Sequence, residues 1–201
     1  MMRYGRGVAL LVVDVQNDFM DPRGTLAVAG APLIVPVINR EIALARDAGS
    51  LVAYSQDWHP KRTPHFARDG GPWPMHCVHD TWGAEFFPTL DVPVGAPLVR
   101  KGTNGEDGYS AFTMRDADTG GSVPTPLGML FYEAGVEAVV VVGVATDYCV
   151  KASALDALHL GYSATVLTDA VAAVNVAPGD GDRALEELAA EGVVVTSTIA
   201  R

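Results

Sequence analysis

The sequence predicts an α/β protein: a three-layer α/β/α sandwich with a six-stranded parallel sheet, formed as a single domain by residues 1–201. Short runs of β-branched residues alternate with stretches of helical periodicity, and such alternation implies parallel strands joined by right-handed crossovers. A chain of 201 residues is long enough to bury one sizeable core. No repeat, low-complexity tract or linker divides it.

The expected strands are short apolar runs. Val8–Val13 is continuously apolar, as in a strand that is buried on both faces of a parallel sheet. Similar runs predict five more strands, over residues 51–55, 98–100, 138–142, 164–167 and 193–196.

The expected helices fall between these strands. Apolar residues recur at helical spacing from Ala31 to Ala48, and Gly49 stands where a C-terminal cap is expected. Further helices are expected over residues 126–134, 147–160 and 182–190. Residues 57–95 instead form a long irregular stretch rich in Pro, Gly, His and Trp, and such stretches inside compact domains are usually functional.

Charge and composition argue against several classes of partner. The net charge of −10 at pH 7 repels nucleic acid and anionic membrane surfaces. No apolar run approaches the roughly 20 residues of a membrane span, and Asp14 interrupts the apolar run near the N-terminus, which argues against a signal peptide. We therefore expect a cytoplasmic protein that acts on a small molecule, and a homo-oligomer is left open because such assemblies are common among soluble enzymes.

Residues able to do chemistry follow four of the predicted strands. Asp14 follows the first strand, residues 56–59 the second, Lys101 the third and residues 145–149 the fourth. Ligands of parallel sheets bind beyond the carboxyl ends of the strands, where the strand order reverses. A cysteine, an aspartate and a lysine at adjacent strand ends can serve as nucleophile, proton carrier and charge stabiliser.

Cys149 is the candidate nucleophile. It stands at an expected helix start, where unpaired backbone N–H groups and a partial positive charge lower a thiol pKa and can hold an oxyanion. Each residue of the trio also has a plainer interpretation when taken alone. Cys149 can be a buried inert cysteine, Asp14 a cap for the loop 15–18, and Lys101 a surface residue.

The irregular stretch gathers one aspartate and four of the five histidines within a short span. They are Asp57, His59, His65, His76 and His79. Asp57 and His59 are two residues apart and point the same way in extended chain. Carboxylate and imidazole ligands suit a divalent transition ion such as zinc, manganese or iron, and open coordination positions would make the site catalytic. Cys77 competes with His76 as a ligand, and the plainer interpretation is a loop with exposed histidines.

Five motifs in order carry a resemblance to a known family. Over nearly its whole length the chain resembles the nicotinamidase branch of the isochorismatase-like cysteine hydrolases, whose fold is Rossmann-like. The motifs that carry this resemblance are VVDVQNDF, DWHP, PWPMHCV, RKGT and GVATDYCVKASALDA. The resemblance implies a catalytic triad of Asp14, Lys101 and Cys149. It also implies a metal ion held by three ligands, Asp57, His59 and His76. In some members of the family a further histidine contributes, and His65 occupies the matching place.

The resemblance extends to the substrate pocket. It implies an oxyanion hole at Ala145 and Cys149, with a cis peptide between Val144 and Ala145 beside the substrate. The aromatic walls implied for the pocket are Phe19, Trp73 and Tyr109. The segment from Asn104 to Ser110 departs from the family pattern, which leaves the pocket rim there undefined.

The activity implied by the resemblance is metal-dependent hydrolysis of nicotinamide to nicotinate and ammonia, a step of NAD salvage, with pyrazinamide as a further substrate. Three alternatives stay open. One is a related amidohydrolase for a carbamoyl or ureide compound, although a ureide offers the metal no pyridine nitrogen. The second is a true isochorismatase, which needs no cysteine nucleophile. The third is a non-catalytic module that binds a metal or a partner.

Overall fold

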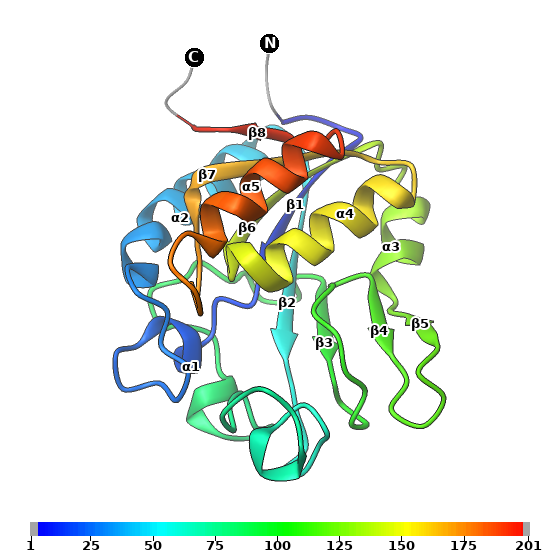
Figure 1. The fold of residues 1–201 in the computed structure, drawn as a ribbon. Helices are drawn as coiled ribbons and strands as arrows, with labels where there is room; N and C mark the ends of the chain where they lie inside the picture. The colour runs from blue at the N-terminus through cyan, green and yellow to red at the C-terminus, as the bar shows by residue number, and fades with distance from the viewer. Residues whose placement is uncertain (1–3, 199–201) are drawn as a thin grey trace.

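The computed structural model describes residues 4–198, and its middle layer is a six-stranded sheet. All neighbouring strands in it are parallel, in the order β3-β2-β1-β6-β7-β8 (Figure 1). The strands are β1 (Val8–Val13), β2 (Leu51–Asp57), β3 (Leu98–Lys101), β6 (Ala138–Val144), β7 (Ser163–Ala172) and β8 (Val194–Thr196). The predicted parallel sheet is therefore confirmed.

Helices cover both faces of the sheet, as the sandwich prediction requires (Figure 1). The covering helices are α2 (Ala31–Asp47), α3 (Leu127–Glu133), α4 (Lys151–His159) and α5 (Asp180–Ala190), and a short helix, α1 (Asn17–Met20), follows β1. Alternate residues of β1 face opposite cores. Leu10 packs in the core that contains α2, while Leu11 packs in the core that contains α3, α4 and α5. Within residues 4–198, none of the helices has the length and apolarity to cross a lipid bilayer.

The strand order reverses between β1 and β6, which lie side by side from Val8 opposite Ala138 to Val13 opposite Gly143. Their close approach requires a glycine at position 143, because a Cβ there would lie 2.1 Å from the Val13 carbonyl oxygen. Asp14 follows directly, with φ 51° in the left-handed region that few non-glycine residues adopt. The sheet therefore places Asp14 at the point where ligands of such folds bind.

Several elements differ from the sequence prediction. β7 continues to Ala172, five residues beyond the predicted end at Leu167, because it stays in the sheet through polar positions that break the apolar pattern. The predicted helix 147–160 begins with a π-helical turn, η3 (Thr146–Val150), before α4. Helix α1 and the hairpin of β4 (Thr113–Arg115) and β5 (Ser122–Pro124) were not predicted. The irregular stretch 57–95 also contains two short 3₁₀ helices, η1 (Ala67–Asp69) and η2 (Trp82–Ala84).

Candidate active site

Lys101 lies at the centre of a buried ionic cluster at the carboxyl ends of β1, β2 and β3. Its Nζ lies 2.6 Å from Asp14 Oδ2 and 2.9 Å from Asp57 Oδ1, and it donates to the Tyr109 carbonyl oxygen at 3.0 Å. These three contacts use the donor capacity of an ammonium group. Ser55 Oγ donates to the other Asp14 oxygen at 2.7 Å. Lys101 is 1% exposed, so its interpretation as a surface residue is wrong.

Cys149 joins this cluster from the π-helical turn η3. Its Sγ and one carboxylate oxygen each of Asp14 and Asp57 lie within 4.8 Å of one another. The structure therefore brings together the three residues that sequence reasoning placed at separate strand ends. Asp14 directs its side chain to Lys101 and Ser55, which is a different role from capping the loop 15–18.

Burial dominates the protonation of this cluster. It raises the pKa of the Cys149 thiol well above its usual value, the carboxylates of Asp14 and Asp57 raise it further, and Lys101 offsets this only in part. Burial also raises the pKa of Asp14, although Lys101 works against it. Lys101 therefore lowers the thiol pKa, as the sequence predicts, while burial and the two carboxylates act in the opposite direction. Asp14 is at the same time a stronger base than an exposed aspartate.

The opposite shift occurs at Asp57. Burial opposes its ionisation, yet Lys101, together with the neighbouring imidazoles of His59 and His76, holds the pKa of its carboxyl well below its usual value. Burial likewise opposes the charge of Lys101, but Asp14 and Asp57 outweigh it and raise the pKa of Lys101 well above normal. Asp57 is thus a carboxylate held next to a permanent cation.

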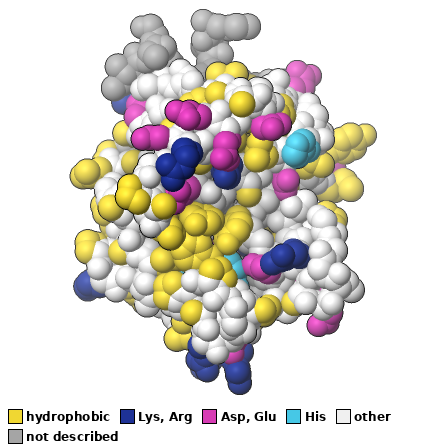
Figure 2. All heavy atoms as spheres, viewed as in Figure 1, with side chains coloured by type: hydrophobic (Ala, Val, Ile, Leu, Met, Phe, Trp, Pro, Cys, Tyr) yellow, Lys and Arg dark blue, Asp and Glu magenta, His cyan; other side chains and the backbone are white. Residues whose placement is uncertain are grey.

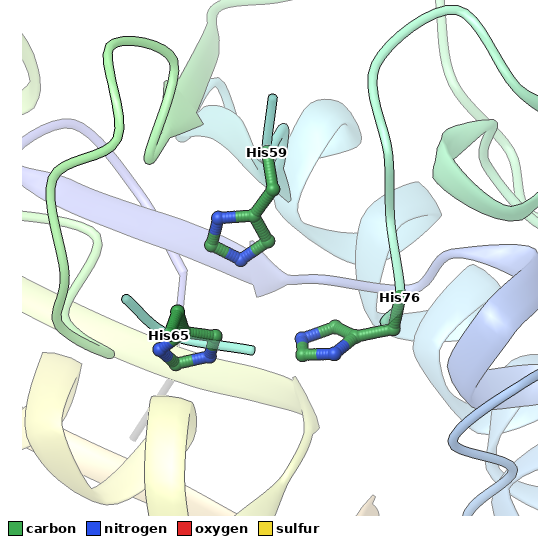
Figure 3. A group of neighbouring side chains, drawn as sticks. All are labelled: His59, His65 and His76. Carbon is green, nitrogen blue, oxygen red and sulfur yellow. The ribbon is translucent and has the colours of Figure 1, made fainter. Parts of the chain in front are cut away.

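Three buried imidazoles converge beside Asp57. One ring nitrogen from each of His59, His65 and His76 lies within 4.8 Å of the others (Figure 3). Asp57 Oδ2 lies 3.8 Å from His59 Nε2 and 3.7 Å from His76 Nε2. Both ring nitrogens of His59 are buried without a hydrogen-bond partner among residues 4–198. Because a buried polar atom without a partner is costly, this arrangement fits a bound cation.

The outer nitrogens of two of these histidines are held by fixed acceptors. His65 Nδ1 lies 2.6 Å from Asp107 Oδ1, and Asp107 also pairs with Arg115 of β4. His76 Nδ1 lies 2.7 Å from the Pro74 carbonyl oxygen. In both rings Nε2 is left to face the shared centre, the arrangement seen around metal ions in proteins.

The other two candidate ligands of this stretch lie elsewhere. Cys77 Sγ lies 3.8 Å from the Gly83 carbonyl oxygen and is not part of the converging group. Of the two neighbours, it is His76 that joins the converging group. His79 is partly exposed and pairs with Asp80.

A narrow apolar cleft opens over Cys149 and the histidine group. It is lined by Phe19, Leu26, Asp57, His65, Trp73, His76, Tyr109, Ala145, Tyr148, Cys149 and Val174. Figure 2 shows apolar side chains gathered at the centre of one face, with a histidine at their edge.

The aromatic wall of this cleft is fixed by contacts among its members. Trp73 Nε1 donates to the Tyr109 hydroxyl at 3.0 Å, and the ring of Tyr148 meets Trp73 edge to face at 4.8 Å between centroids. Phe19 lies against His76, with centroids 5.4 Å apart. The three aromatic residues expected from the resemblance thus line the cleft.

The cis peptide between Val144 and Ala145 is present. Ala145 lines the cleft, whereas Val144, expected to contact substrate, is 1% exposed and lies behind the lining.

The Asp147 carboxylate accepts the N–H of Val174 at 3.0 Å and of Asn175 at 2.8 Å, which holds the segment that brings Val174 to the cleft.

Sequence reasoning missed four residues of the site. They are Leu26, Asp107, Tyr148 and Val174. Tyr148 adjoins Cys149 in a motif that was already singled out, and this neighbourhood was the available signal. Asp107 falls in the segment that departs from the family pattern, where no signal was available.

Comparison with known proteins places this arrangement in a family. The chain matches the isochorismatase domain over residues 8–200, and it belongs to that family. It is 39% identical to the nicotinamidase of Escherichia coli (strain K12) over 203 residues, which cover 93% of each chain.

Two solved structures are similar over nearly their whole length. The pyrazinamidase of Pyrococcus horikoshii, solved in complex with zinc, has a TM-score of 0.84 and 40% identity, covering 95% of this chain and 99% of its own. PnC1 from L. infantum, solved in complex with nicotinate, has a TM-score of 0.88 and 34% identity, covering 100% of this chain and 98% of its own.

Proposed function

We propose that this chain is a nicotinamidase, a cysteine hydrolase that converts nicotinamide to nicotinate and ammonia and also accepts pyrazinamide. The observation that carries the proposal is that one small aromatic cleft is lined by Cys149, with Asp14 and Lys101 behind it, and by Asp57 together with two members of the histidine group. The names of the relatives support the same activity.

The proposed reaction begins with transfer of the Cys149 proton to Asp14. The sulfur then attacks the carboxamide carbon, and the backbone N–H groups of Ala145 and Cys149 hold the oxyanion. Asp14 returns the proton to the departing ammonia, which leaves a thioester on Cys149. Water hydrolyses this thioester and restores the thiol. Lys101 keeps Asp14 in place and balances its charge throughout.

We propose that one divalent transition ion is held by Asp57, His59 and His76, with His65 as a further ligand. Neutral imidazoles and a carboxylate suit zinc, manganese or iron, and the zinc in the Pyrococcus horikoshii structure supports this assignment. When bound, the ion supplies a Lewis acid for the pyridine nitrogen or for water. Phe19, Trp73, Tyr109 and Tyr148 would then enclose the ring.

The remaining parts of the proposal concern the setting of the reaction. We expect residues 1–201 to act as one cytoplasmic domain on small carboxamides, with neither nucleic acid nor membrane as a partner. The net charge of −10 supports this. Assembly into a homo-oligomer stays a prediction.

The test is ammonia release by the zinc-loaded protein from nicotinamide, pyrazinamide and a ureide compound, each followed to steady state. We expect kcat/KM above about 10⁴ M⁻¹s⁻¹ for nicotinamide, the lower end of the range for natural substrates. A clear preference for the ureide would support the alternative amidohydrolase. No release from any of the three would support a binding module.

A further inference from the structure

Asp18 is a buried carboxylate that the proposed reaction does not use. It lies in α1, next to Phe19, and is 6% exposed. Its Oδ1 accepts the backbone N–H of Thr25 at 3.0 Å, and its Oδ2 accepts the backbone N–H of Cys77 at 2.7 Å. Both oxygens therefore hold backbone groups that belong to segments far apart in the sequence.

Each of these two segments delivers a residue to the cleft. The N–H of Leu26, the residue after Thr25, bonds to the backbone oxygen of Asp18 at 3.2 Å, and the Leu26 side chain lines the cleft. His76, the residue before Cys77, lines the same cleft and belongs to the histidine group. One side chain thus connects the apolar wall to a proposed metal ligand.

The local backbone depends on this connection. Cys77 has φ 44°, in the left-handed region that non-glycine residues rarely adopt. Its N–H points to Asp18 while its Sγ lies near the Gly83 carbonyl oxygen. Such conformations persist where the surroundings hold them in place. The bond from Cys77 to Asp18 therefore holds the turn that directs His76 inward.

The Asp18 carboxylate also requires the space that a glycine leaves at position 83. A Cβ at position 83 would lie 2.0 Å from Asp18 Oδ2, so only glycine leaves room for the observed position. An asparagine at position 18 would direct an amide N–H₂ at one of the two N–H donors, that of Thr25 or that of the buried Cys77, and that donor would lose its acceptor.

We propose that Asp18 is a positioning residue that sets His76 toward the metal and Leu26 toward the substrate. It touches no reacting atom. The inference rests on the proposed function for the identity of the centre that His76 serves.

The test uses two variants that disturb the same contact by different routes. Asp18→Asn removes an acceptor, and Gly83→Ala keeps every functional group but displaces the carboxylate. The matched control is Asp169→Asn. The Asp169 carboxylate accepts the N–H of Thr198 at 2.9 Å, and neither residue lines the cleft.

The readouts are zinc affinity, measured by competition with a chromogenic chelator, and the separate values of KM and kcat for nicotinamide. Loss of a group that orients a metal ligand costs about 10–100-fold in metal affinity. We expect a loss of that size in both test variants, together with a raised KM, because Leu26 moves as well. Asp169→Asn should bind zinc as the parent does.

The outcomes distinguish failure of the positioning role of Asp18 from failure of the proposed function. Zinc affinity within about twofold of the parent in both folded test variants, a change of only ~0.4 kcal/mol, would overturn the positioning role. Should Asp18→Asn fail to fold, Gly83→Ala decides alone. A parent protein that binds zinc but does not hydrolyse nicotinamide would overturn the proposed function. The zinc affinities of the variants would still decide whether Asp18 positions His76. A parent that binds no zinc would overturn both.

Discussion

Lys101 Nζ lies 2.9 Å from Asp57 Oδ1, and this contact joins the two halves of the site. The same ammonium group lies 2.6 Å from Asp14 Oδ2. One buried cation therefore serves the carboxylate beside the nucleophile and the carboxylate beside the histidine group. Two anions this close to each other would otherwise repel strongly in a buried site.

The first prediction concerns Lys101 and the acidity of Cys149. The thiolate is the form that reacts with iodoacetamide, so the alkylation rate rises with pH through the raised thiol pKa. Lys101→Met removes the cation that lowers this pKa, so the alkylation curve should move to higher pH. Each unit of pKa changes the thiolate fraction at neutral pH about tenfold. A curve that does not move would show that Lys101 has no influence on the thiol.

The second prediction concerns Asp14 and has the opposite sign. The Asp14 carboxylate raises the pKa of Cys149, so Asp14→Asn should move the alkylation curve to lower pH. Hydrolysis should nevertheless fall by about 10²–10⁴-fold, because the proton acceptor is lost. A variant with a more acidic thiol and less activity would identify Asp14 as the base. Activity that rises together with thiol acidity would contradict that role.

The third prediction concerns Asp107, whose carboxylate fixes His65 through Nδ1. In Asp107→Asn the tautomer and orientation of His65 are no longer set, so zinc affinity should fall by about 10–100-fold. Equilibrium competition with a chelator measures this. The matched control is Asp116→Asn, since the Asp116 carboxylate accepts hydrogen bonds from Asp118 and Thr119 of its own exposed turn. Equal zinc affinities in the two variants would rule out an orienting role for Asp107.

The fourth prediction concerns the ring nitrogen of the substrate. A site built to engage a heteroatom rejects an analogue that lacks it by about 10⁴-fold, so nicotinamide should exceed benzamide in kcat/KM by about that factor. In His76→Ala, which should lose most of its metal, activity should fall and the preference should shrink. Benzamide hydrolysis within about tenfold of nicotinamide by the parent would contradict recognition of the ring nitrogen by the metal.

The sequence was sufficient for features that follow from chain periodicity. β1 is apolar along its whole length because both of its faces are buried. A charged residue directly after such a strand, such as Asp14, must lie at the carboxyl end of the strand. Short elements carry too few residues for a period to show, so α1 and the β4–β5 hairpin were missed. Asp107 and Val174 reach the site through tertiary contacts with His65 and Asp147, which local sequence does not encode.

The protonation of Cys149 shows the same limit. A helix start and a nearby lysine both favour a thiolate, and both were visible in the sequence. The structure adds burial and two carboxylates, and together these raise the thiol pKa. Burial of this depth follows from the packing of β1, β2 and β3 around the cluster, which only the folded chain defines.

The most direct test of the account compares nicotinate formation by the parent and by Cys149→Ala, both loaded with zinc. The variant should bind nicotinamide with nearly the parent's affinity, because the aromatic wall and the histidine group are intact. Its turnover should fall by several powers of ten, since loss of a nucleophile disables the whole catalytic unit. Cys77→Ala is the control and should retain most of the activity. Turnover by Cys149→Ala within about tenfold of the parent would contradict the assignment of Cys149 as the nucleophile, because nucleophile substitutions in cysteine and serine hydrolases cost far more.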